Sequence, residues 1–457
     1  MVLSKTKRFM SLMVFMILTV SAYAQRSAIQ YFRPYDQDGL NVFETSKYDT
    51  VVFDGLKLRI GANFSQQYQN LKHSNSENVI GEVNKNALYD LSPGFNLAMA
   101  NFNIDVQIAD GIRVSLVSYM STRHHNEFWV KGGYFQIDKV GFLNSDLMNN
   151  IWKNLTLKIG HMEINYGDAH FRRTDAGNAL YNPFVENNIM DAFTTEIGGE
   201  LYWQKSGVLA MIGITDGEIQ GSVTKGDDRA PSFYGKVGYD KSLNEDLRVR
   251  LTGSVYTTKS SISNTLYGGD RAGSRYYFAM EPAAATLTGN SFSGRINPGF
   301  KDNVTSFMIN PFVKFKNLEI FGTYEVSKGN SQVENGEIQS TDPALPVLTK
   351  LENRQFNQYA VDGVYRFAND KMYVGAKYNV VDGDVVFGSS TTQPNIAQGT
   401  RDDVKIQRTA FAAGWFINKN ILLKGEYVTQ KYMDFPTADI RSNGKFEGFV
   451  IEGVIGF

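Results

Sequence analysis

The segment Lys445-Phe-Glu-Gly-Phe-Val-Ile-Glu-Gly-Val-Ile-Gly-Phe457 alternates two kinds of side chain up to the last residue of the sequence. On an extended strand Phe449, Ile451, Ile455 and Phe457 share one apolar face, and the other face carries smaller, mixed residues. A strand of this kind left at an open edge invites aggregation. In a closed barrel the last strand pairs with the first and no edge remains. We therefore predict that this segment closes a β-barrel.

The other end of the chain predicts export. Three basic residues within the first eight precede an apolar stretch at 9–20, and the small-x-small sequence Ala22-Tyr-Ala24 follows. This is the pattern of a cleaved signal peptide over residues 1–24. A membrane-anchoring helix is disfavoured because the apolar stretch falls well short of about 20 residues. Residues 25–50 are expected to form a periplasmic N-terminal segment, which either hangs free or plugs or crosses the barrel floor.

Composition excludes several classes of protein. The chain has 457 residues and no cysteine, so it uses neither a disulfide framework nor a thiol nucleophile. Three of the 46 basic residues lie in the signal peptide, which leaves 43 against 47 acidic residues, a balance that does not favour nucleic-acid binding. No later run is long enough for a transmembrane helix. A β-barrel is then the only way for the chain to span a membrane.

Segments of period two recur along the whole mature chain, over residues 51–457. Each alternates apolar and polar side chains, as a strand with one lipid face and one watery face does. We predict about sixteen strands, within a range of 14–18, at 55–69, 102–108, 112–120, 128–137, 155–164, 197–203, 208–214, 233–239, 247–257, 305–315, 318–326, 356–367, 372–380, 404–415, 421–428 and 446–457.

The connections alternate in length. Short turns are predicted at 109–111, 205–207, 316–317, 368–371 and 418–420. Long polar connections are predicted at 71–93, 165–195, 216–231, 258–303, 327–354, 382–402 and 433–444. Short periplasmic turns that alternate with long extracellular loops are typical of an outer-membrane barrel. A soluble two-domain protein gives no reason for this rhythm.

Two connections break the rhythm. The upper loop at 121–127 is short, and the lower link at 138–154 is long. Within that link Leu147, Ile151 and their neighbours Met148 and Trp152 have helical spacing, which predicts a short amphipathic helix.

Aromatic residues near strand ends predict an interfacial girdle, although strand propensity alone also favours them. They are Tyr119, Phe128, Trp129, Tyr202, Trp203, Tyr324, Tyr365, Tyr378, Trp415 and Tyr427.

The inward face of the predicted strands is charged. Its main basic residues are Lys57, Arg59, Arg113, Lys158, Arg248, Arg250 and Lys377, with Lys236, Lys314 and Lys424 on the same face. Its acids are Asp105, Glu200, Glu319, Glu325, Asp362 and Glu426. A Lys or Arg on the lipid face costs about 2–4 kcal/mol near the midplane, so these residues belong in a wet lumen. Such a lumen offers a path that sorts solutes by bore and wall charge.

The connection at 165–195 is long for a loop without a function. It carries the charged or titratable residues Asp168, His170, Arg172, Arg173 and Asp175. We expect this loop to fold into the barrel and to place these side chains at a pore constriction. The alternative is a loop on the surface.

The sequence Gly-His-Met-Glu-Ile-Asn-Tyr-Gly-Asp-Ala-His-Phe-Arg-Arg at 160–173, the signal peptide and the terminal Phe resemble outer-membrane porins of Bacteroidetes-type bacteria, which are similar to the phosphate-selective porin O and P family. The resemblance implies a passive diffusion channel for small hydrophilic solutes or ions in the outer membrane. It also implies a homotrimer with a basic, anion-selective bore, and its partners would be outer-membrane lipid and the solutes. Here acids are interspersed in the predicted lumen, so an anion or phosphate preference stays open.

The sequence gives little support for a catalytic site or a metal site. His161, Glu163, Asp168 and His170 lack the tight ligand spacing of a zinc site, and none of the five histidines lies in a nucleophile motif. We predict no catalytic residues, no metal and no cofactor. A barrel-borne hydrolase and a non-conducting adhesin or structural protein are the rival classes, and conductance in a planar bilayer distinguishes them from a pore.

Overall fold

The computed structural model describes residues 28–96, 98–121, 128–174, 178–217, 230–259, 264–268, 276–290, 293–331, 334, 352–386 and 401–457. The signal peptide predicted at 1–24 and the short upper loop predicted at 121–127 lie almost wholly outside these residues.

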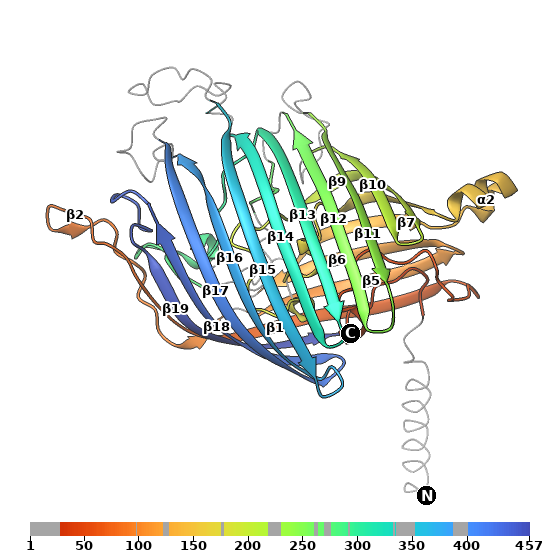
Figure 1. Cartoon of the computed structure of the whole chain (residues 1–457), viewed down its shortest axis with the longest axis horizontal. Helices are drawn as coiled ribbons and strands as arrows, with labels where there is room; N and C mark the ends of the chain where they lie inside the picture. The colour runs from red at the N-terminus through yellow and green to blue at the C-terminus, as the bar shows by residue number, and fades with distance from the viewer. Residues whose placement is uncertain are drawn as a thin grey trace, which may run out of the picture.

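Within the described residues the chain forms one closed barrel of sixteen antiparallel strands (Figure 1). The sixteen strands are β1 Lys57–Ser74, β5 Met99–Ala109, β6 Ile112–Ser121, β7 Phe128–Ile137, β8 Leu155–Glu163, β9 Thr195–Lys205, β10 Val208–Thr215, β11 Ser232–Ser242, β12 Leu247–Thr258, β13 Asn303–Phe315, β14 Leu318–Asn330, β15 Arg354–Phe367, β16 Met372–Val386, β17 Arg401–Asn418, β18 Ile421–Met433 and β19 Lys445–Gly456. Each predicted segment overlaps one of these strands, so the predicted fold and strand number are confirmed.

The barrel closes between its first and last strands. β1 pairs with β5 on one side and with β19 on the other, where Tyr68 lies opposite Ile451. At the end of this seam the Ala62 N–H donates to the Phe457 carbonyl (3.1 Å) and the Phe457 N–H donates to the Ala62 carbonyl (3.0 Å). The prediction that the final segment is a closing strand is confirmed.

The alternation of β19 separates an outer and an inner face. Phe449, Ile451 and Ile455 are 40–44% exposed on the outer wall, whereas Val450 and Glu452 between them are fully buried. The same apolar exposure recurs on strand after strand around the barrel. A continuous apolar outer wall is stable against lipid and not against water, and the barrel is therefore transmembrane.

The predicted aromatic girdle is only partly correct. Seven of the aromatics are 37–60% exposed on the outer wall: Phe128, Trp203, Tyr324, Tyr365, Tyr378, Trp415 and Tyr427. Tyr119 and Tyr202 are instead buried, because their positions in the strand alternation face inward. The Tyr202 hydroxyl donates to Glu200 (2.5 Å), which is an inward-facing acid.

The predicted tight turns join β5 to β6, β9 to β10, β13 to β14, β15 to β16 and β17 to β18. At the β9–β10 turn Gly207 has φ +88°, a left-handed conformation that glycine adopts without strain. The link at 138–154 contains the predicted helix, α2 Asp146–Trp152, whose first turn is capped by the Ser145 hydroxyl. Figure 1 shows α2 projecting from the barrel wall.

The remaining elements are short. They are β2 Val79–Ile80, β3 Val83–Asn84, β4 Gly94–Phe95, α3 Leu287–Asn290, and the 3₁₀ turns η1 Gln37–Gly39, η3 Gly141–Leu143, η4 Ala169–Phe171 and η5 Ala179–Tyr181. Among the described residues, none of the helices is both long and apolar enough to cross a membrane.

The interior of the barrel is largely filled. Residues from the connections at 164–194 and 264–302, including Phe184, Val185 and Phe300, form one buried apolar cluster with inward-facing residues such as Phe356 and Val364 of β15. This differs from the uniformly wet lumen that the charged strand faces suggested. The connections carry enough apolar side chains to build a core against part of the wall.

Candidate functional site

The connection between β8 and β9 crosses the interior to the opposite wall. Its backbone N–H groups are bound there by inward side chains, since Val185 donates to Glu426 of β18 (2.9 Å) and Met190 donates to Gln358 of β15 (2.9 Å). Lys424 of β18 donates to the carbonyls of Ala179, Asn182 and Phe184 at 2.7–2.9 Å. The ammonium group thus satisfies three backbone carbonyls that would otherwise be buried unpaired.

Asn side chains stabilise the conformation of this connection. The Asn187 side-chain oxygen accepts from the Thr174 N–H (2.7 Å), and the Asn182 oxygen accepts from the Phe184 N–H (2.9 Å). Asn bonded to nearby backbone is a common way to hold an irregular turn.

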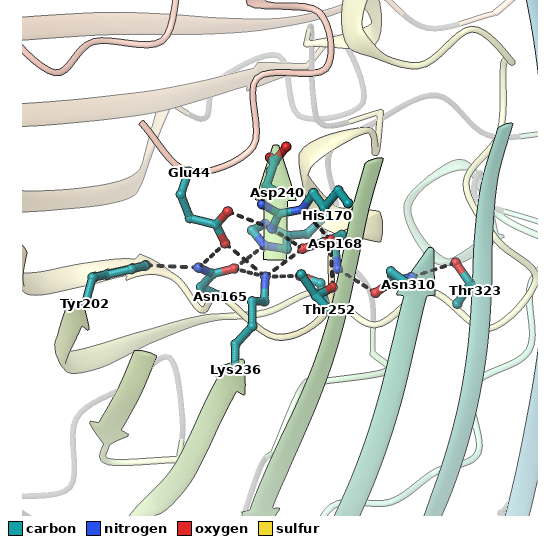
Figure 2. A network of polar contacts seen from close by, with 12 residues as sticks. Glu44, Asn165, Asp168, His170, Tyr202, Lys236, Asp240, Thr252, Asn310 and Thr323 are labelled. Carbon is teal, nitrogen blue, oxygen red and sulfur yellow. Dashed lines mark hydrogen bonds and ion pairs between the residues drawn. The ribbon is translucent and has the colours of Figure 1, made fainter. Parts of the chain in front are cut away.

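Asp168 is the centre of a buried charge network (Figure 2). Its carboxylate accepts from Arg250 of β12 (2.8 Å), from Lys236 of β11 (2.9 Å) and from the Thr252 hydroxyl (2.7 Å). Its own N–H donates to Asn310 of β13 (2.7 Å). One residue of the connection is therefore fixed to three consecutive strands.

Glu44 completes this network from the N-terminal segment. Its carboxylate lies 2.6 Å from Arg250 and 3.4 Å from Lys236, and it accepts from Asn165 (3.1 Å). Burial by itself raises the pKa of Glu44, but Arg250 and Lys236 outweigh it and hold the pKa at about 2. For Asp168 the same two cations again outweigh burial and lower the pKa. Both acids are therefore ionised at neutral pH.

His170 lies close to this network on η4. Its ring contacts Glu163 through Nδ1, and Nε2 lies 2.9 Å from the Asn165 side-chain oxygen. His161, another candidate ligand in the sequence, contacts the Thr195 hydroxyl (3.0 Å). Among the described residues, no group of three or more His, Asp and Glu is placed to hold a metal ion.

The two arginines of the predicted constriction have different partners. Arg172 pairs with Asp362 of β15 (3.1 Å) and its guanidinium lies 4.5 Å from the ring centre of Phe321. Arg173 pairs with Asp191 of its own connection (2.9 Å). Both arginines line a small cavity of about 30 Å³, to which Lys377 of β16 also contributes.

The predicted constriction residues do not converge on one point. Asp168 binds β11 and β12, Arg172 binds β15, and His170 and Arg173 also line a larger cavity on the side of β6–β8. Asp175 lies outside the described residues.

Two cavities lie between the filled part of the interior and the wall. One is about 230 Å³ and the other about 140 Å³. Arg33, Arg113, Tyr134, Lys158 and Phe171 line both of them, so the cavities adjoin. Of the predicted lumen residues, Arg113 and Lys158 are the two that line both cavities.

The other predicted lumen residues are spread over the inner wall. Arg248 and Arg250 share Asp240 as a partner (2.7 and 3.1 Å) and belong to the Asp168 network. The Arg59 guanidinium lies 4.5 Å from the Phe32 ring centre. Lys57 pairs with Asp54 at the start of β1 (2.9 Å), at the rim of the barrel.

The N-terminal segment 28–50 contacts the inner wall along its length. Tyr35 donates to Asp105 of β5 (2.8 Å), and Lys47 donates to the Leu155 carbonyl (2.6 Å). Arg33 donates to the Phe171 carbonyl (2.8 Å) and lies 3.8 Å from the Tyr181 ring centre. Of the two alternatives for this segment, these contacts favour the one in which it plugs the barrel.

Sequence reasoning missed Glu44, Arg33 and Asn165. Asn165 and Arg33 carry no pattern that separates them from ordinary loop residues. Glu44 is a lone acid in a segment without periodicity, and its partner Lys236 is 192 residues away. Only the unusual density of inward cations on β11 and β12 hinted that a buried acid was needed.

Solved structures with a similar barrel fold are known. The chain is similar to an anion-selective porin from Comamonas acidovorans, with 11% identity over 88% of this chain and 100% of that chain and a TM-score of 0.50. OprB of Pseudomonas putida matches at 9% identity over 88% and 94% of the two chains, with a TM-score of 0.49. The outer membrane channel DcaP of Acinetobacter baumannii matches at 11% identity over 89% and 99%, with a TM-score of 0.48.

No protein-family model matches the chain, and neither does the sequence of any curated protein. At these low identities the similarity to solved structures concerns the fold alone.

Proposed function

We propose that this protein is an outer-membrane porin, a passive diffusion channel for small hydrophilic solutes or ions. The observation that carries the proposal is the position of two adjoining cavities inside a closed barrel whose outer wall is apolar. A barrel of sixteen strands is wide enough to enclose an aqueous path. The path runs along β6–β8, beside Arg113 and Lys158.

The charge around this path favours anions. The larger cavity is lined by five basic side chains, those of Arg33, Arg113, Lys131, Lys158 and Arg173, and by two acids, Asp105 and Glu163. Excess charge of one sign in a narrow polar path attracts ions of the opposite sign. The same argument supports small anions in general and does not single out phosphate.

The loop residues Arg172 and Arg173 act in this proposal as part of the constriction. Both line the small cavity between the crossing connection and β14–β16, and Arg173 also lines the larger cavity of the proposed path. Charge reversal of both residues is expected to change conductance and ion selectivity. Unchanged conductance and selectivity in a folded variant would remove this role.

The test is single-channel recording in a planar bilayer under a salt gradient, with chloride and with phosphate. We expect steady ohmic steps and a reversal potential of the sign that an anion-selective channel gives. Lys158→Glu is expected to shift that potential toward cation selectivity. A silent protein that is correctly folded would contradict the proposal and favour an adhesin, structural protein or enzyme. The expected homotrimer is tested in parallel by light scattering in detergent.

A further inference from the structure

The larger cavity is a candidate binding site as well as a section of the proposed path. It is enclosed on one side by the strands β5–β8 and on the other by residues 32–35 and the crossing connection. Its volume of about 230 Å³ lies below the range of about 300–1,000 Å³ for pockets that hold drug-sized ligands. The cavity therefore suits a single small ring.

Two of its cations have no acidic partner. In the described part of the chain no carboxylate lies within ion-pair distance of Arg33 or Lys158. Arg33 donates to the Gly39 and Phe171 carbonyls, and Lys158 donates to the Tyr202 hydroxyl (3.3 Å). By contrast, Arg173 is paired with Asp191 and Arg113 lies 3.8 Å from Asp105. The cavity thus holds positive charge that an anionic group on a ligand would neutralise.

Aromatic side chains form much of the cavity wall. They are Phe32, Tyr35, Tyr134, Phe171 and Tyr181. Phe32 and Tyr35 meet edge to face, with ring centres 5.2 Å apart, and Lys158 lies 5.8 Å from the Tyr134 ring centre. Flat apolar faces beside fixed cations suit a ligand that has both an apolar ring face and a charge.

Amide and carboxyl groups complete the lining with both donors and acceptors. Asn63, Asn101, Asn103 and Asn178 line the cavity together with Asp105. Among the described residues, the Asn178 side-chain oxygen and one Asp105 oxygen are buried without a hydrogen-bond donor, and the Arg113 Nε–H is buried without an acceptor. A ligand rich in hydroxyl groups would satisfy them, since each hydroxyl both donates and accepts.

We propose that this cavity binds an anionic monosaccharide, a sugar ring that carries one carboxylate, phosphate or sulfate group. The ring C–H face would lie on the aromatic wall, the hydroxyls would meet the Asn residues, and the acid group would meet Arg33 and Lys158. An aromatic acid would leave the acceptors unpaired, and an inorganic anion would leave the aromatic wall unused. This assignment rests on the proposed channel function for its biological use, but not for the binding itself.

The experiment measures binding of four probes to the purified full-length protein in detergent by titration calorimetry. The probes are glucuronate, glucose, benzoate and inorganic phosphate. We expect glucuronate to bind at least about tenfold more tightly than each of the others, because only glucuronate uses both the charge and the amides. Equal binding of glucose, benzoate or phosphate, or no binding of glucuronate, would overturn the assignment. Glucose 6-phosphate then separates a carboxylate site from a phosphate site.

Variants test the residues. Lys158→Gln is expected to weaken glucuronate binding about tenfold through the loss of a charge-assisted hydrogen bond, and Tyr134→Leu is expected to weaken it through the loss of the aromatic wall. Lys241→Gln, an exposed lysine near the β11–β12 turn, is the matched control and should bind as the unaltered protein does. If both cavity variants fold and bind glucuronate normally, the site is wrong.

Conductance distinguishes this proposal from the channel function. A protein that conducts but does not bind glucuronate would contradict the sugar site and leave the porin proposal in place. A protein that binds glucuronate but does not conduct would contradict the porin proposal and leave the site in place.

Discussion

Glu44 is one of the residues that attach the N-terminal segment to the wall. Its carboxylate is buried beside Arg250 and Lys236, and removing one charge from a buried pair leaves its partners without compensation. We expect Glu44→Gln to destabilise the folded barrel by about 3 kcal/mol, the lower end of the range for such a change, because Asp168 still pairs with both cations. The measurement is the unfolding temperature, which a semi-native gel gives as the temperature at which heated samples change their migration.

Asp54→Asn is the matched control for this substitution. Asp54 also pairs with a lysine, Lys57, but its side chain is 72% exposed. Exposed pairs contribute little because water screens them. If Glu44→Gln and Asp54→Asn have the same unfolding temperature, the buried network does not hold the segment.

The Glu44 pKa also predicts a pH dependence. It lies at about 2 in the folded protein, below its ordinary value of 4.5, so its contribution to stability is complete above about pH 4.5 and is lost as the pH falls toward 2. A difference of this size corresponds to about 3 kcal/mol. We expect the unfolding temperature to decrease as the pH is lowered through this range, and to decrease less in Glu44→Gln than in the unaltered protein. Parallel pH curves for the two proteins would contradict this prediction.

At the scale of the strands, the sequence predicts the fold well. Lipid outside and polar groups inside impose a two-residue period that each strand shows on its own, as in the alternation of Phe449 and Ile451 with Val450. Tyr202 and Trp203 show the limit of the method. Both are aromatic and adjacent, and only the strand register decides that Tyr202 faces inward to Glu200.

The site is less predictable because its pairs are distant in sequence. The sequence predicts Arg172 at the pore constriction and Asp362 on the inward face of a strand, but the two residues are 190 positions apart. Each charged side chain in the crossing connection had several candidate partners of opposite sign, and nothing local distinguished them. The sequence does not predict the packing of residues 28–50 either, since those residues carry no periodic pattern.

The face assignment of β19 gives a prediction at this scale. Ile451 is 44% exposed on the outer wall opposite Tyr68 of β1. Ile451→Lys is expected to reduce the free energy of folding into lipid vesicles by about 2–4 kcal/mol, the cost of a lysine on the lipid face near the midplane. Glu447 lies on the same face of β19, near the start of the strand. Glu447→Lys should therefore cost far less. Equal folding of the two variants would contradict the predicted lipid contact.

At the scale of the whole molecule, the interior is divided between a packed side and an open side. The apolar cluster formed with the crossing connection lies against β9–β13 and β15–β19, and the cavities of about 230 and 140 Å³ lie along β6–β8. The N-terminal segment borders both cavities through Arg33. The bore is thus set less by the number of strands than by the segments folded inside them.

This division predicts the effect of removing the N-terminal segment. Deletion of residues 28–50 takes Arg33, Tyr35 and Glu44 out of the interior and joins the cavities to the barrel mouth. We expect single-channel conductance to rise at least about twofold, because conductance grows with the cross-section of the narrowest part of the path. The deletion also removes the cation Arg33 from the cavity lining, so anion preference should fall as conductance rises. Glu44→Gln in the intact chain is the comparison, since it weakens the attachment and keeps the segment, and it should give brief openings to the larger conductance. A deletion variant that folds and conducts as the intact protein does would show that the solute path avoids this segment.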